Sequence, residues 1–149
     1  MSQAPASTDH HVVVIGASAG GLDALRSLLR AGPFEEAALI IVGHGDRNSA
    51  SNLPALLARD SDQSIVTAEA GMKLAPDRVF VIPPGVKLSL KGHHFHQDPE
   101  VDSIDSLMIR VAENLGPRTI GVVLSGAGED GAEGARRIEA SGGKVFVQS

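Results

Sequence analysis

The chain has no cysteine, no tryptophan and no tyrosine, and it has only four phenylalanines. Without cysteine, disulfide bonds, thiolate catalysis and thiolate metal sites are excluded. With so few aromatic rings, stacking on nucleic acid bases or on sugars is not expected. No apolar run approaches the roughly 20 residues that a membrane-spanning helix needs, so membrane insertion is not expected either. A net charge of −5 argues against nucleic acid or an anionic membrane surface as the main partner.

The length of 149 residues and the hydrophobic content of 42% are typical of one globular domain with a sizeable core. Residues 1–10 lack the basic start and the apolar centre of a signal peptide, and we interpret them as a flexible N-terminal tail. Residues 11–149 would then form the folded domain. The absence of a targeting segment predicts a cytoplasmic protein.

Apolar runs of strand length alternate with amphipathic helical patterns along the chain, which predicts an α/β fold. The runs are continuous, as expected for strands of a parallel sheet that is covered on both faces. We therefore predict a single doubly wound, mostly parallel sheet with helices on both faces, and a polar, exposed β-hairpin beside it. The predicted strands are 11–18, 38–44, 64–70, 78–84, 118–126 and 144–148, the helices 20–32, 49–61, 103–116 and 129–143, and the hairpin 87–97.

Three strand ends carry residues that are capable of chemistry: Ser18 after the first strand, His44 at the end of the second, and Asp130 after the strand at 118–126. In open parallel sheets ligands bind beyond the carboxyl ends of the strands, so these residues belong to one edge. A serine, a histidine and a carboxylate are the components of an acyl-transfer triad. Taken singly, each has a plainer interpretation, with Ser18 and Asp130 as helix caps and His44 as a polar strand end.

The turn at Gly16–Gly20 distinguishes between two uses of a glycine-rich loop. A dinucleotide site needs Gly-x-Gly-x-x-Gly and an acidic residue that closes the second strand, and Ser18 and His44 occupy those two positions. The Gly-Lys-Ser/Thr of a P-loop is absent as well. The turn instead fits the Gly-x-Ser-x-Gly nucleophile elbow, between a strand and a helix. A nucleotide-binding domain is an alternative that a rise in melting temperature with NAD or ATP would support.

Several motifs follow one another along the chain: "IGASAGG", a strand ending in His44, "RVFVIPPG", "SIDSLM" and "VVLSGAGEDGAEG". In this order they resemble the catalytic domain of the chemotaxis protein-glutamate methylesterases, the CheB-type enzymes. That family has Gly-Ala-Ser-Thr-Gly-Gly, Gln-His-Met-Pro and Thr-Gly-Met-Gly-x-Asp-Gly-Ala in the corresponding places. The resemblance extends from about Val12 to Gln148, and it favours Ser18 as a nucleophile over Ser18 as a cap.

The resemblance implies a serine esterase that hydrolyses glutamate γ-methyl esters on chemoreceptors and can also deamidate glutamine there. Ser18 would attack the ester carbonyl, His44 would transfer the proton, and Asp130 would orient the imidazole. The backbone N–H groups of Ala19 and Ala127 would hold the oxyanion. No cofactor and no metal are implied. The implied partners are the cytoplasmic helices of chemoreceptors and a separate regulatory receiver or methyltransferase, with no nucleic acid.

The chain departs from the family pattern after His44 and at both ends. Asp46 and Arg47 lie close behind His44, and Asp46 could replace Asp130 as its partner. The resemblance stops early at the C-terminus, and the family's receiver domain is absent, so activation by phosphorylation in cis is not expected. These departures favour an alternative function, a catalytically silent methylesterase-fold domain that binds proteins in chemotaxis-like signalling. Activity toward a receptor fragment that bears methyl esters separates the two.

Two further clusters are interpreted as structural features. His93, His94 and His96 could bind a transition metal, but no carboxylate or cysteine partner is evident, and we interpret them as solvated. Asp102 is expected to favour the start of the helix that follows it through the helix dipole. Asp105 matches the Asp of the family's Ser-Val-Asp and is expected to face the site cleft.

Overall fold

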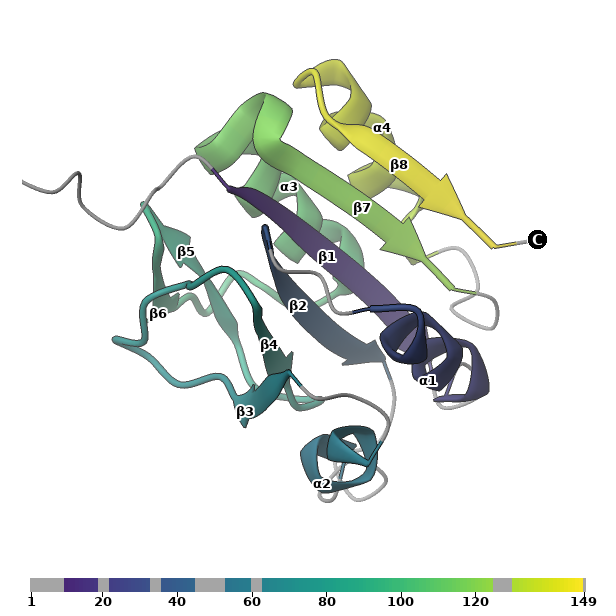
Figure 1. Cartoon of the computed structure of the whole chain (residues 1–149). Coiled ribbons are helices and arrows are strands. Elements are labelled where there is room, and N and C mark those ends of the chain that lie inside the picture. Colours follow the sequence, from purple (N-terminus) through teal and green to yellow (C-terminus); the bar gives the residue numbers. More distant parts are fainter. Residues whose placement is uncertain are drawn as a thin grey trace, which may run out of the picture.

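A six-stranded parallel sheet forms the centre of the fold (Figure 1), in a computed structural model that describes residues 10–18, 22–32, 36–44, 53–59, 63–124 and 130–148. Neighbouring strands follow the order β3-β4-β2-β1-β7-β8, and all five pairings are parallel. The doubly wound fold predicted from the sequence is confirmed. The strands are β1 (His11–Ser18), β2 (Ala37–His44), β3 (Ser64–Thr67), β4 (Arg78–Ile82), β7 (Thr119–Val123) and β8 (Lys144–Val147).

Both faces of the central strands are covered, which is why these strands are continuous apolar runs. Val14 and Ile15 follow each other in β1, and both are fully buried, in the cores on opposite faces. The helices α1 (Leu22–Arg30) and α2 (Leu53–Ala58) cover one face, and α3 (Ile104–Leu115) and α4 (Ala132–Ala140) cover the other (Figure 1). A short 3₁₀ helix, η3 (Gly116–Arg118), leads from α3 into β7. None of the helices in the described ranges has the length and hydrophobicity of a membrane span.

β1 lies inside the sheet, and later strands are added on both sides of it. After β1 the chain adds β2, β3 and β4 on one side, and it later adds β7 and β8 on the other. At such a switch point the connections that follow the strands diverge, and a crevice opens at the carboxyl edge. The carboxyl ends of β2, β1 and β7 therefore lie at the edge where this fold class binds ligands.

The first turn of α3 lies directly against the end of β1. A Cβ atom on Gly16 would be 2.7 Å from Cγ2 of Ile104, so a residue without a side chain permits this approach. Ser103 caps α3: its Oγ accepts from the N–H of Ser106, and the Oγ of Ser106 accepts from the N–H of Ser103, both at 3.0 Å. The start of α3 is therefore defined both by its cap and by its contact with the sheet.

The hairpin of β5 (Leu88–Lys91) and β6 (His94–Gln97) is present but is less exposed than the sequence pattern predicts. Leu88, Leu90 and Phe95 are buried at 5% exposure or less. Phe95 packs against Phe80 of β4, with the ring centroids 5.3 Å apart. Alternation distinguishes the two faces of a strand, but it does not indicate which face another element covers. The expectation of an exposed hairpin is therefore wrong for these apolar residues.

Asp98 anchors the hairpin to α3. Ser89 Oγ donates a hydrogen bond to Oδ2 of Asp98 at 2.8 Å, and Nε of Arg110 on α3 donates to the same oxygen at 3.2 Å. The N–H of Glu100 donates to Oδ1 at 3.2 Å. The hydrogen bond from Ser89 is the main cause that lowers the pKa of Asp98 below its ordinary value, against the opposing effect of burial. The ionised form of Asp98 therefore stabilises the fold.

Asp98→Asn should destabilise the fold in a pH-dependent way. Because the pKa of Asp98 is lower in the folded than in the unfolded chain, the carboxylate stabilises the fold above about pH 4, and this contribution is lost as the pH falls through the lowered value. Urea unfolding at about pH 7 and about pH 3 should show a difference between wild type and variant that shrinks in acid.

Glu139→Gln, which changes an exposed carboxyl group on α4, is the control for this experiment. Ser89→Ala should weaken the pH dependence that Asp98 confers, because it removes the main donor. An effect of Asp98→Asn that is equal at both pH values would contradict the assignment.

Candidate functional site

Ser18 and His44 are the last residues of two neighbouring strands. They are register partners in the parallel pairing of β1 with β2, and neighbouring strands lie about 4.8 Å apart. Their backbones are therefore side by side at the carboxyl edge of the sheet. The sequence pattern predicts both residues at strand ends, and that placement is confirmed. Their side chains lie outside the described part of the structure.

Asp130 follows β7, which is the other neighbour of β1. Its carboxylate binds the start of α3: Oδ2 accepts from the N–H of Ile104 at 3.0 Å, and Oδ1 accepts from the N–H of Asp105 at 2.9 Å. Asp130 thus acts as a capping residue toward α3.

Ile104 connects Asp130 with the end of β1. Its N–H donates to Asp130, and its side chain contacts Gly16, two residues before Ser18. A Cβ atom on Gly131, the residue after Asp130, would also lie 3.6 Å from Cγ2 of Ile104. Asp130 therefore lies on the α3 side of the sheet, beside the end of β1.

Asp105 makes the converse contact, with the start of α4. Its Oδ1 accepts from the N–H groups of Gly131 and Gly134 at 3.0 and 2.7 Å. The resemblance predicts Asp105 near the cleft, but it does not identify these partners, which lie 26 and 29 residues away in the chain. The signal that could have found them is a carboxylate in the first turn of one helix together with glycines at the uncapped start of another.

The remaining predicted site residues lie outside the described ranges. Ala19 and Ala127, the expected oxyanion donors, are among them, and so are Asp46 and Arg47. The contact of His44 with an aspartate and the nucleophilic role of Ser18 therefore stay predictions.

A cavity of about 400 Å³ opens between the end of β2 and the start of α3. Gly43, the residue before His44, lies in its wall, and so does Ile104, the donor to Asp130. Its volume falls within the range of small-ligand sites in proteins. The cavity is lined by residues 42–43, 83–87 and 101–104.

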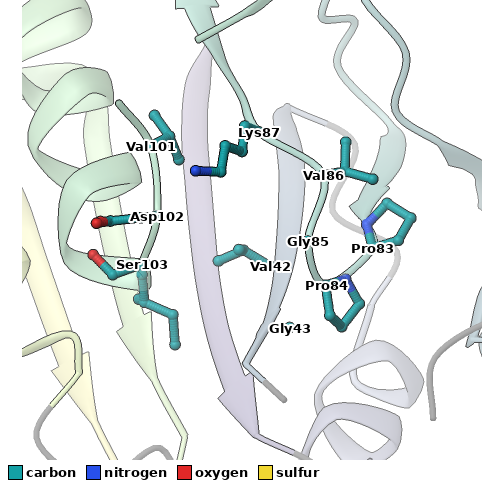
Figure 2. A pocket seen from close by; sticks show the side chains of 11 residues that line it. Val42, Gly43, Pro83, Pro84, Gly85, Val86, Lys87, Val101, Asp102 and Ser103 are labelled. Atoms are coloured by element: carbon teal, nitrogen blue, oxygen red, sulfur yellow. The ribbon is translucent and has the colours of Figure 1, made fainter. Parts of the chain in front are cut away.

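The walls of this cavity combine apolar side chains with the cationic Lys87 and the polar residues Asp102 and Ser103. Figure 2 shows Lys87 reaching across the opening toward Val101, while the oxygen atoms of Asp102 and Ser103 point toward α3. Nζ of Lys87 donates to the carbonyl oxygen of Pro99 at 3.4 Å, a long contact that an incoming anion could replace. The cavity is therefore suited to a ligand with an aliphatic part and a negatively charged neighbour.

The hairpin histidines make separate contacts. His93 lies edge-on against His10, with ring centroids 5.8 Å apart, and Nε2 of His96 is 3.0 Å from Ser89 Oγ. His94 is exposed. In the part of the chain that the structure describes, no three histidine, aspartate or glutamate side chains gather as a metal-ligand set.

Ser89, His96 and Asp98 are the same residue types as the predicted triad, but their arrangement is not catalytic. Ser89 is only 1% exposed, and its hydroxyl donates to Asp98. A nucleophilic serine has to reach the substrate and pass its proton to a base. This group therefore holds the hairpin in place.

The chain matches the family described as CheB methylesterase over residues 13–149. A protein-glutamate methylesterase/protein-glutamine glutaminase of Moorella thermoacetica is 34% identical over 149 residues, covering 92% of this chain and 35% of the relative. A Rhodobacter capsulatus protein, described as an uncharacterized 104.1 kDa protein in the hypE 3′ region, is 40% identical over 101 residues, covering 64% of this chain and 11% of the relative. The chain spans less than half the length of each of these relatives.

The fold is also similar to a solved structure, the crystal structure of the Thermotoga maritima CheB methylesterase catalytic domain. The TM-score is 0.81 and the sequence identity 26%, over 92% of this chain and 78% of that one.

Proposed function

This chain belongs to the CheB methylesterase family, and on that premise we propose that it hydrolyses glutamate γ-methyl esters on chemoreceptors. The products are a glutamate carboxylate and methanol. The proposal extends to glutamine side-chain amides, which release ammonia by the same steps, because the M. thermoacetica relative is named a glutaminase as well. Enzyme and substrate helices meet in the cytoplasm in this proposal, and a separate receiver protein or methyltransferase is the regulatory partner.

The pairing of Ser18 with His44 at the ends of adjacent strands is the observation that supports the proposal most. Alternate positions of a strand belong to the same face of the sheet. Position 18 therefore shares a face with Gly16, and position 44 shares one with Val42. Both Gly16 and Val42 meet the α3 side of the sheet. Asp130 is bound to the first turn of α3 on that side. In the proposal the three residues of the triad act on this side of the sheet edge.

In the proposed mechanism Ser18 Oγ attacks the ester carbonyl while His44 accepts the hydroxyl proton. The N–H groups of Ala19 and Ala127 stabilise the charge on the carbonyl oxygen. His44 then protonates the departing methoxide, and methanol leaves an acyl-serine. A water molecule that His44 deprotonates attacks the acyl-serine. The bond from the acyl carbon to Ser18 Oγ breaks, His44 returns the proton to Oγ, and the glutamate carboxylate is released. Asp130 keeps the imidazole in one tautomer and stabilises the imidazolium.

The cavity between β2 and α3 is the proposed position of the substrate side chain. It adjoins His44 through Gly43 and adjoins Asp130 through Ile104. Its aliphatic lining suits the methylene groups of a glutamyl side chain. Lys87 at the opening would pair with a carboxylate elsewhere on the receptor helix.

A catalytically silent domain that binds proteins in chemotaxis-like signalling is the second candidate. The sequence Gly45-Asp46-Arg47 after His44, where the resemblance predicts Met-Pro, favours it. A methyl-esterified receptor fragment separates the two functions, since a binding domain would release no methanol.

Ser18→Ala should abolish methanol release from such a fragment and change the free energy of unfolding by no more than about 1 kcal/mol. The reason is that a nucleophile contributes chemistry, whereas a cap contributes stability. Activity and urea unfolding are measured on the same preparation. A variant that keeps wild-type turnover but unfolds at markedly lower urea would identify Ser18 as a cap.

His44→Gln should lower turnover by orders of magnitude, because glutamine cannot accept the serine proton. The wild-type rate should fall as the pH drops through about 6.5, where histidine becomes protonated. The measurement is the pH profile of kcat/KM for wild type and variant. A flat wild-type profile from about pH 5 to 8, together with an active variant, would end the assignment of His44 as the base.

Asp130→Asn should reduce kcat by about 1,000-fold or more, because the imidazole loses its fixed tautomer and its partner charge. Asp46→Asn is the matched control: it removes a carboxylate two residues from His44 and should cause only a small loss. Both variants are assayed on the same ester at the same pH, after urea unfolding has shown that they are folded. The reverse ranking would assign the triad acid to Asp46.

A further inference from the structure

Two carboxylates link the starts of α3 and α4, because each accepts hydrogen bonds from the start of the other helix. We call this reciprocal contact the carboxylate exchange. Asp130, from the segment before α4, accepts from the N–H groups of Ile104 and Asp105 at 3.0 and 2.9 Å. Asp105, from the first turn of α3, accepts from the N–H groups of Gly131 and Gly134 at 3.0 and 2.7 Å. Each helix start is therefore held by a side chain from the other.

The hydrogen bonding at the start of α4 depends on this exchange more than that at the start of α3. The N-cap residue of α4 is Gly131, with a φ of 108° and no side-chain cap. α3 has a cap of its own, since Ser103 accepts from the N–H of Ser106. Asp105 therefore supplies the acceptor that the start of α4 lacks.

The position of Gly131, the residue after Asp130, is restricted by its neighbours and by its hydrogen bond to Asp105. A Cβ atom on Gly131 would be 3.1 Å from Val123 at the end of β7 and 3.6 Å from Ile104. The N–H of Gly131 donates to Asp105, and Asp130 beside it is half-buried. The peptide that joins Asp130 to Gly131 is thus held between the sheet and α3.

We propose that Asp105 is a positioning residue for Asp130, an inference that rests on the function proposed above. Asp105 does not touch the reacting atoms; it fixes Gly131, and thereby the direction from which the Asp130 carboxylate meets His44. A misplacement of about 1 Å in a catalytic constellation costs on the order of 100-fold in rate. Loss of Asp105 therefore lowers kcat and leaves KM unchanged.

Three substitutions at Asp105 separate position from charge. Oδ1 of Asp105 accepts both hydrogen bonds, so Asp105→Asn keeps the acceptor and should retain most of kcat. Asp105→Ala removes the acceptor and should lower kcat by about 10- to 100-fold, with KM within about twofold of the wild type. Asp105→Glu keeps the charge but shifts the acceptor by one methylene group, and it should also lower kcat. The opposite order, with Asp105→Glu more active than Asp105→Asn, would indicate a charge effect and overturn the proposal.

The double variant Asp105→Ala/Asp130→Asn tests whether Asp105 acts through Asp130. Once Asp130 is replaced, the loss of Asp105 should cost little further activity, so the two effects should not be additive. Ile138→Val is the stability control, because Ile138 is fully buried in α4 and the lost methyl group costs about 1 kcal/mol without touching the exchange. Its kcat should equal that of the wild type.

Methanol release from the methyl-esterified receptor fragment and urea unfolding are measured for every variant. A wild-type chain without hydrolysis would overturn the proposed function, and this inference with it. An active wild type with an equally active Asp105→Ala, or with additive effects in the double variant, would overturn the positioning role alone. If Asp105→Ala does not fold, the kcat values of Asp105→Asn and Asp105→Glu decide whether the positioning role holds.

Discussion

The first turn of α3 is the contact on which the arrangement of the sheet edge depends. Its N–H groups bind Asp130, its Asp105 carboxylate binds the start of α4, and its Ile104 side chain fills the space above Gly16. A partly buried N–H group that loses its acceptor costs about 1 kcal/mol. Two carboxylates serve four such groups here, so neither helix start can shift without exposing the hydrogen-bonding groups of the other.

The parallel sheet explains why residues far apart in the chain reach this turn. β2, β1 and β7 are neighbours and run in the same direction, so their carboxyl ends lie at one edge of the sheet (Figure 1). An antiparallel β2 would have carried His44 to the opposite edge from Ser18, a full strand length away. The topology thus brings the backbones of the candidate nucleophile and base side by side without a long loop. Asp130 follows β7, and the first turn of α3 binds its carboxylate.

Much of this arrangement can be predicted from the sequence, because it depends on local periodicity. The buried strands that end at Ser18 and His44 are continuous apolar runs, and Ser103 marks the start of α3 as a serine before an amphipathic pattern. The partners of Asp105 could not be predicted, since hydrogen bonds across 26 and 29 residues depend on how two helices pack. The burial of Phe95 was missed for the same reason: alternation does not indicate which face is covered.

The hairpin region also brings a serine, a histidine and an aspartate together, as Ser89, His96 and Asp98. The direction of the hydrogen bond from the serine hydroxyl shows that this group is structural. Ser89 is buried, and its hydroxyl donates a hydrogen bond to Asp98, which lowers the pKa of Asp98. A nucleophilic serine needs the reverse: exposure to substrate, and a neutral imidazole rather than a carboxylate as its acceptor. At the sheet edge the carboxylate of Asp130 is already bound to the backbone of α3. That anchoring holds the acid on the α3 side of the sheet, beside the end of β1. In the triad proposed above, the serine proton is then left to the imidazole.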